Sequence, residues 1–157
     1  MRTGLAISAV ALLVLGGCAA RRIPGTDIED TDDTRAILQV MERYRTAVEA
    51  RDADAVLKLC SESFKDDAGS PKVEDRLDYA TLKKKLPENF AKLDEVKLEL
   101  NVRKIEFHPE TSAASAVYNY NLSFRIPRVS NKSQNESEIK QMWFKRDHGQ
   151  WKIASGI

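Results

Sequence analysis

The chain has 157 residues, of which 42% are hydrophobic and 31% charged, with 25 lysines and arginines against 24 aspartates and glutamates. This length fits one domain with a single hydrophobic core. The composition is that of an ordinary soluble globular protein, and it excludes a disordered chain, a collagen and a membrane protein with several spans.

The first 17 residues have the three-part layout of a secretory signal. Arg2 is followed by an apolar core from Leu5 to Leu15 and then by two glycines ahead of Cys18. A membrane span needs about 20 strongly apolar residues, and this run is short and weakly apolar at both ends. Leu15-Gly16-Gly17-Cys18 resembles the lipobox of bacterial lipoproteins, and an uncleaved anchor helix is the alternative interpretation.

The resemblance to a lipobox implies that residues 1–17 are removed and that Cys18 carries a diacylglycerol and an N-acyl chain such as palmitate. Because each buried methylene contributes about 0.8 kcal/mol, two or three acyl chains on one residue should hold the protein firmly on the membrane. The expected location is the bacterial cell envelope. Ala19 after the cysteine favours the outer membrane, facing the periplasm, by the sorting rule of many Gram-negative bacteria.

The mature chain is close to neutral, because removal of Arg2 leaves 24 basic against 24 acidic residues. Nothing in this balance indicates nucleic acid or an anionic surface as a partner. Residues 18–33 are polar, with Pro24, Gly25 and five acids from Asp27 to Asp33, and we expect a flexible tether there. Those acids lack the spacing of a calcium-binding loop.

Three helical patterns follow the tether. An apolar stripe from Ile37 to Val48 predicts the first helix, with an N-cap among residues 32–34. Asp52 can cap a second helix that runs through Cys60, and this lone cysteine is expected to be a buried hydrophobic residue. The third pattern spans residues 79–93, and Pro87 predicts a kink or a restart near Leu86.

From Asp94 the hydrophobic period changes to two, which is typical of strands. Apolar residues alternate with polar ones over residues 96–102, and the alternation continues from Ile105 shifted by one residue. This shift indicates a β-bulge near residues 103–104. His108 is expected to be exposed in a turn before a second strand, residues 116–126. Residues 127–137 are expected to be a polar loop, and Asp147-His148-Gly149 predicts a closing hairpin.

Helices followed by strands predict an α+β domain over residues 34–157, with three helices packed on one side of a strongly bent antiparallel sheet. "ERYRTAVEARDADAVLKLCSESF" and "WFKRDHGQWKIASG" resemble the first two helices and the closing hairpin of the nuclear transport factor 2-like superfamily, a cone-shaped cystatin-like fold. The resemblance covers Thr34 to the end. It implies a cavity on the concave side of the sheet, and it says little about activity because this fold hosts enzymes, ligand binders and assembly domains.

Ketosteroid isomerases of this superfamily use a tyrosine of the first helix and two acids, and Tyr44 matches the tyrosine. The ungapped spacing of the family's base falls on Ala68, next to Asp66 and Asp67. The second acid has no counterpart, since the polar positions of the second strand are Asn119, Asn121 and Ser123. No metal-binding, phosphate-binding or nucleophile motif stands out, so the sequence assigns no catalytic residue, cofactor or metal.

Four aromatic residues with polar groups are predicted to line a pocket: Tyr44, Tyr118, Tyr120 and Trp143. One interpretation is a non-catalytic, membrane-anchored module that binds a small apolar ligand or an envelope protein. The other is a small isomerase, dehydratase or cyclase that uses Tyr44 and an acid at Asp66 or Asp67. An acid directed into the helix–sheet cavity would favour the enzyme, and an acid in solvent would favour the binder. A homodimer through the sheet face stays open.

Overall fold

The computed structural model describes residues 21–66 and 76–157, without the side chains of residues 130 and 131. The predicted signal, Cys18 and Asp67 lie outside these residues. In chain order the elements are α1 (Asp32–Glu49), α2 (Ala53–Leu59), β1 (Lys65–Asp66), β2 (Leu77–Asp78), α3 (Tyr79–Phe90), β3 (Asp94–His108), the short 3-10 helix η2 (Pro109–Thr111), β4 (Ala113–Ile126), β5 (Ser130–Asp147) and β6 (Gln150–Ser155).

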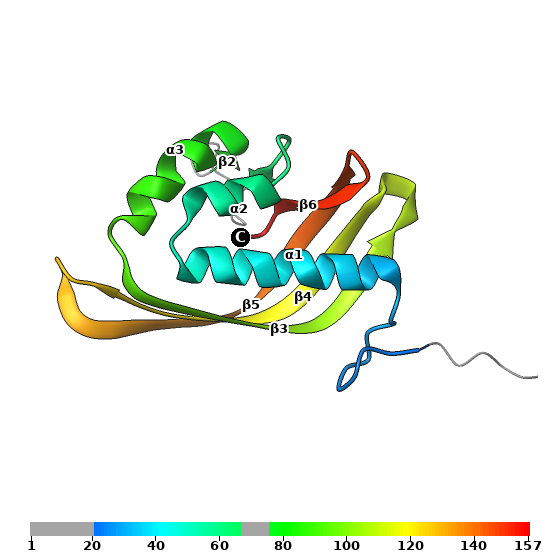
Figure 1. Cartoon of the computed structure of the whole chain (residues 1–157), viewed down its shortest axis with the longest axis horizontal. Helices are drawn as coiled ribbons and strands as arrows, with labels where there is room; N and C mark the ends of the chain where they lie inside the picture. The colour runs from blue at the N-terminus through cyan, green and yellow to red at the C-terminus, as the bar shows by residue number, and fades with distance from the viewer. Residues whose placement is uncertain (1–20, 67–75) are drawn as a thin grey trace, which may run out of the picture.

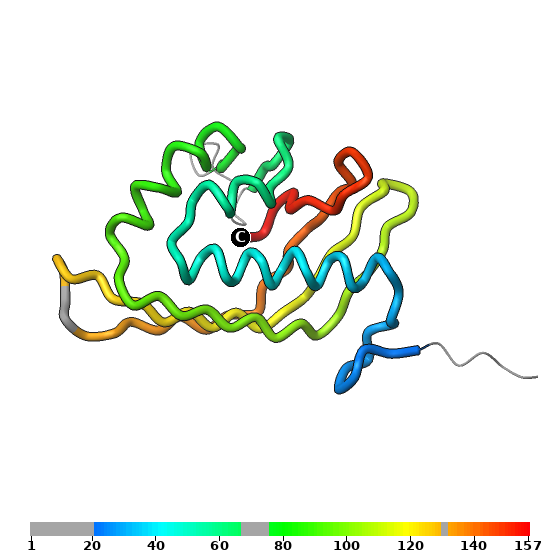
Figure 2. Tube along the Cα trace, in the orientation of Figure 1, coloured from blue at the N-terminus to red at the C-terminus, as the bar shows by residue number. Residues whose placement is uncertain are grey.

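The strands β3 to β6 form one antiparallel sheet in sequence order. The sheet curves around α1, and all three helices lie on its concave side (Figure 1). In the view of Figure 2 the C-terminus ends between the traces of α1 and α2, whereas the N-terminal segment leaves beside the start of α1. The predicted α+β architecture is therefore confirmed.

The first helix begins two residues before the predicted domain start at Thr34. Its N-cap is Thr31, whose hydroxyl accepts a hydrogen bond from the Thr34 amide, while the Thr34 hydroxyl accepts one from the Thr31 amide. Such reciprocal capping satisfies two amides that the helix itself leaves unpaired. The predicted apolar stripe is buried, since Ile37 is fully covered and Met41 is 2% exposed.

Residues 21–30 form a turn that differs from the flexible tether expected there. Backbone hydrogen bonds join Ile23 N to Ile28 O and Asp30 N to Arg21 O, at 2.8 and 2.6 Å. Gly25 has a φ of +77°, which lets the chain reverse, and Ile28 is buried. One apolar residue and a glycine therefore fold a segment whose composition is mainly polar.

The second helix starts as expected, with the Asp52 carboxylate accepting a hydrogen bond from the Ala55 amide at 2.9 Å. The third helix runs through Pro87, so the restart expected as one alternative near Leu86 does not occur. Proline removes one backbone N–H, and the carbonyl left without it belongs to the exposed Lys83, where water can donate instead. Buried Leu82 and Phe90 hold the helix on either side.

The bulge in β3 is confirmed, as the register with β4 shifts between Val102 and Lys104. The predicted loop over residues 127–137 is limited to a turn at residues 127–129, because β5 begins at Ser130 and continues the ladder, with Gln134 opposite Phe124. Its side chains are mostly exposed, so this part of the strand carries no hydrophobic alternation in the sequence. Main-chain hydrogen bonds to β4 hold it there.

The closing hairpin is confirmed. Asp147 pairs with Gln150, and the two residues between them, His148 and Gly149, have φ values of +47° and +79°. Two positive φ angles are the requirement of the tight type I′ turn, which matches the twist of the flanking strands.

Candidate functional site

Three tyrosines meet between α1 and the concave face of the sheet. Tyr118 and Tyr120 are two residues apart on β4, so both side chains point to the same face, and Tyr44 faces them from α1. All three belong to one hydrophobic core, with exposures of 0%, 8% and 6% in that order. No hydrogen bond joins the Tyr44 hydroxyl to any residue of the described ranges.

The surroundings of these tyrosines keep the phenols neutral. Burial raises the pKa of Tyr44 well above its usual value, and the neighbouring Tyr120 and Tyr118 raise it further. Burial, followed by the charges of Glu136 and Glu138, raises the pKa of Tyr120 to about 12. The hydroxyls therefore stay protonated at physiological pH, and each can donate a hydrogen bond to a carbonyl or another acceptor.

The end of the chain is locked beside this cluster. The amide of Gly156 donates to the Asp66 carboxylate at 2.6 Å, and the Tyr118 hydroxyl donates to the Gly156 carbonyl at 3.0 Å. Gly156 has a φ of +87°, and a Cβ there would overlap the backbone of Gln141 and Met142. Asp66, on the short strand β1, is thus directed into the domain and binds the C-terminal segment.

Charged side chains of β5 lie on the same side of the sheet as the tyrosines. Lys140 is opposite Tyr118 and Glu138 opposite Tyr120, and the Lys140 Nζ lies 4.1 Å from the centre of the Tyr120 ring. This distance permits a cation–π interaction. Sequence reasoning missed Glu136 because it lay in the predicted loop, although its even spacing with Glu138 and Lys140 was a usable signal.

The structure separates Trp143 from the three tyrosines. Its neighbours Met142 and Phe144 are buried in the core, so Trp143 points to the outer face of the sheet. There its ring lies 5.0 Å from that of His108. His108 is consequently half-buried rather than exposed, since a side chain stacked on an indole loses contact with water.

His108 also contacts two side chains in the order seen in nucleophilic triads. Its Nε2 lies 3.3 Å from the Ser115 Oγ, and its Nδ1 lies 3.9 Å from a Glu110 oxygen. Ser115 is only 1% exposed and lies within the paired strand β4, where the backbone amides serve the ladder. A substrate cannot reach this hydroxyl, so the arrangement does not form a nucleophilic site.

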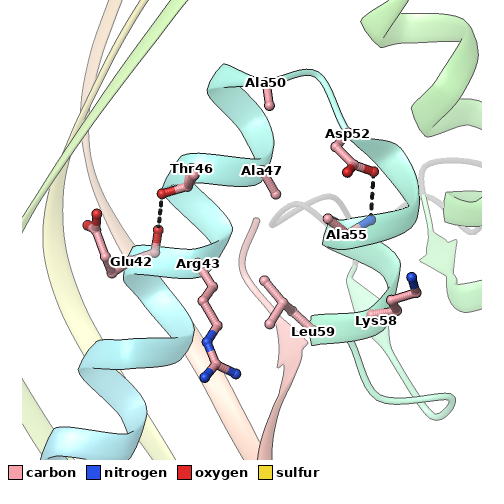
Figure 3. A pocket seen from close by; sticks show the side chains of 9 residues that line it. All are labelled: Glu42, Arg43, Thr46, Ala47, Ala50, Asp52, Ala55, Lys58 and Leu59. Atoms are coloured by element: carbon pink, nitrogen blue, oxygen red, sulfur yellow. Dashed lines mark hydrogen bonds between the residues drawn. The ribbon is translucent and has the colours of Figure 1, made fainter.

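The described residues line cavities elsewhere. One, of about 410 Å³, lies between α1 and α2 (Figure 3) and is lined by Glu42, Arg43, Thr46, Ala47, Ala50, Asp52, Ala55, Lys58 and Leu59. Another, of about 350 Å³, lies along β4 and β5 and is lined by Asn119, Asn121, Ser137, Glu138 and Ile139. Neither contains the tyrosine cluster, so pocket lining by Tyr44, Tyr118 and Tyr120 stays a prediction.

Within residues 21–66 and 76–157, no three His, Cys, Asp or Glu side chains are grouped so that they could hold a metal ion. No helix in that part of the chain is both long and apolar enough to cross a membrane.

No protein-family model matches the sequence, and no curated protein matches it either. Solved structures do resemble it. A conserved protein from Planctomyces limnophilus has a TM-score of 0.66 at 14% identity, over 79% of this chain and 92% of its own. A candidate dehydratase of the nuclear transport factor 2-like family from Streptomyces avermitilis has a TM-score of 0.64 at 13% identity, over 79% of this chain and 93% of its own.

A candidate scytalone dehydratase from Novosphingobium aromaticivorans has a TM-score of 0.63 at 18% identity, over 79% of this chain and 80% of its own. Structural similarity at sequence identities this low shows a shared fold but not a shared activity. Together with the helices on the concave side of the sheet, the comparisons define the class: the chain has the nuclear transport factor 2-like fold.

Proposed function

We propose that the protein is a lipoprotein of the bacterial cell envelope, anchored by acyl chains on Cys18 to the outer membrane and facing the periplasm. The apolar run followed by Leu15-Gly16-Gly17-Cys18 supports the anchor. Only residues 19 and 20 separate Cys18 from the folded turn that begins at Arg21. The domain therefore lies close to the membrane rather than at the end of a long tether.

The domain itself is a non-catalytic binding module for a small apolar ligand that carries a hydrogen-bond acceptor. Neutral phenols within an apolar core supply donors and apolar contact together, which is the usual chemistry of small-molecule sites. The observation that carries the non-catalytic assignment is the hydrogen bond from Gly156 to Asp66. A general base takes a proton through a carboxylate oxygen, and one oxygen of this carboxylate, Oδ2, is instead engaged by the Gly156 amide.

One observation favours the enzyme as a second candidate. Asp66 is directed into the domain and lies close enough to Tyr44 and Tyr118 for its charge to raise the pKa of both phenols. This direction is the one expected of an isomerase, dehydratase or cyclase. Candidate dehydratases also occur among the solved structures that share the fold.

The test is a screen of the wild-type protein with unsaturated ketones and related lactones. We expect no turnover. Any hit is repeated with Tyr44→Phe and Asp66→Asn, because loss of one oxyanion-stabilising donor typically costs a factor of about 100 or more. A reaction that both substitutions reduce by that factor would overturn the binding assignment in favour of the enzyme.

The binding partner of the module can instead be a protein of the envelope. A homodimer through the outer face of the sheet is a separate prediction. Ile139, on that face, is 63% exposed and lies opposite Asn119. If two copies associate there, Ile139→Asp should yield monomers in sedimentation velocity. Monomers from the wild-type protein would contradict the dimer and leave the small-ligand proposal intact.

A further inference from the structure

Two lysines of the closing hairpin lie where the segment after α2 runs along β6, and we call Lys145 and Lys152 the lysine corner. Cys60 forms a bridge with Ile153, and the Ser61 amide donates to the Ile153 carbonyl at 2.8 Å. These contacts bring residues 58–63 alongside the edge of the sheet. On the sheet itself, Lys145 and Lys152 are directly opposite each other on β5 and β6.

Hydrogen bonds aim both ammonium groups of the sheet at residues 58–63. The Lys145 Nζ donates to the Ser63 hydroxyl at 2.7 Å, and the Lys152 Nζ donates to the carbonyl of Lys58. The Ser63 hydroxyl also lies 3.1 Å from that of Ser61. Every acceptor is neutral, so these contacts orient the two positive charges without compensating them.

The lysine corner lacks an acidic partner within the described residues. Neither of its two ammonium groups forms an ion pair within 4.0 Å there, and Glu62, the acid of the neighbouring segment, is exposed and makes none with them. Like charges directly opposite on neighbouring strands destabilise a sheet. Each sheet ammonium uses one N–H in the contacts above, so further donors remain for an anion.

We propose that the lysine corner binds a phosphate group, either of a soluble phosphorylated molecule or of a lipid headgroup. Lysines bind phosphate as point charges, and a multiply charged anion with several oxygens can satisfy more than one ammonium group at once. The Ser63 hydroxyl offers a further polar contact. This site is separate from the tyrosine cluster. Binding of a soluble phosphorylated molecule there does not depend on the lipid anchor at Cys18.

The experiment measures how fast an amine-reactive reagent labels each lysine of the full-length protein in detergent, by peptide mass spectrometry. With inorganic phosphate at ten times its dissociation constant, labelling of Lys145 and Lys152 should slow by about tenfold, because only the free site reacts. Exposed Lys83 and Lys84 on α3 are the internal controls and should not change.

A second arm places the same protein in nanodiscs of phosphatidylcholine, with or without phosphatidylglycerol. Protection by inorganic phosphate identifies a soluble phosphate ligand, and protection by phosphatidylglycerol alone identifies a headgroup. Lys145→Gln with Lys152→Gln should abolish phosphate binding in titration calorimetry, whereas Lys83→Gln with Lys84→Gln should retain it. Labelling that neither phosphate nor phosphatidylglycerol slows in the wild-type protein would overturn the proposal, whatever the fate of the variants.

Discussion

The Asp33 carboxylate, in the first turn of α1, accepts a hydrogen bond from the indole N–H of Trp151 on β6, at 3.0 Å. The same carboxylate pairs with Arg146, whose guanidinium lies 4.7 Å from the centre of the Trp151 ring. The first helix is thereby tied to the closing hairpin. An acid at this end of a helix also complements the positive end of the helix dipole.

Asp33→Ala should lower the free energy of unfolding by about 1–2 kcal/mol, because it leaves the indole N–H of a buried tryptophan without its acceptor. Urea denaturation measures the effect. Asp32→Ala is the matched control, since it removes the same charge from the same turn but from a fully exposed side chain whose ion pair with Arg35 is 3.9 Å long. Equal losses would mean that the dipole, and not the link to Trp151, accounts for the effect.

Gly156→Ala tests the lock at the C-terminus. We expect a loss of about 2–4 kcal/mol, because the new Cβ adds left-handed backbone strain and a collision with the Gln141 backbone. Gly149→Ala is the control: its φ is also positive, at +79°, but nothing lies within 4 Å of an added Cβ. Similar losses at both positions would contradict the close packing of the chain end.

Several elements could be predicted because one residue or dipeptide dictates them. Asp52 caps α2, the parity slip before Ile105 marks the bulge, and Asp147-His148-Gly149 forms the hairpin. Two other elements depend on contacts with distant parts of the chain or on exposure, which the local sequence does not encode. The first part of β5 depends on hydrogen bonds to β4, which leave no hydrophobic pattern, and α3 tolerates Pro87 because the affected carbonyl is exposed.

The candidate site was predictable only in part. The stripe of α1 and the alternation of β4 placed Tyr44, Tyr118 and Tyr120 on facing surfaces. The contact of Asp66 with Gly156 joins residues 90 positions apart, and no local pattern encodes such a contact. Trp143 was predicted to line the pocket because it is aromatic with a polar group. Its position in the alternation of β5, between buried Met142 and Phe144, puts it on the outer face instead.

The raised pKa values of the tyrosines predict a loss of stability in alkali. Because their folded pKa values lie above that of the unfolded chain, the stabilisation is complete below about pH 10 and declines as the unfolded chain ionises. For Tyr120 this window extends to about pH 12. Ultraviolet phenolate absorbance should therefore rise at higher pH in the native protein than in urea. A native titration that coincides with the one in urea would contradict the burial of these phenols.

Cys60 should be unreactive in the folded protein. It is 5% exposed, and burial raises the pKa of its thiol to about 12, so little thiolate is present at neutral pH. A disulfide reagent should label it slowly in buffer and rapidly in urea. With Cys18 acylated, one thiol per chain should be titrated on unfolding, and two would argue against the lipid anchor.

Cys18→Ser should block lipid transfer and signal cleavage together, because the thiol is the acceptor of the diacylglycerol. The expected product is an unprocessed precursor that retains residues 1–17, seen by intact-mass measurement. A mature chain cut before position 18 in this variant would show that another type of signal directs export.

Native mass spectrometry of the protein, extracted in mild detergent from its own membrane, tests the lipid-anchored binding module most directly. The expected species is a chain that begins at Cys18, carries covalent acyl chains and retains a small molecule that leaves on denaturation. Tyr44→Phe should keep this ligand, since its ring packing is unchanged. A chain with an unmodified Cys18 and no bound molecule would contradict the account.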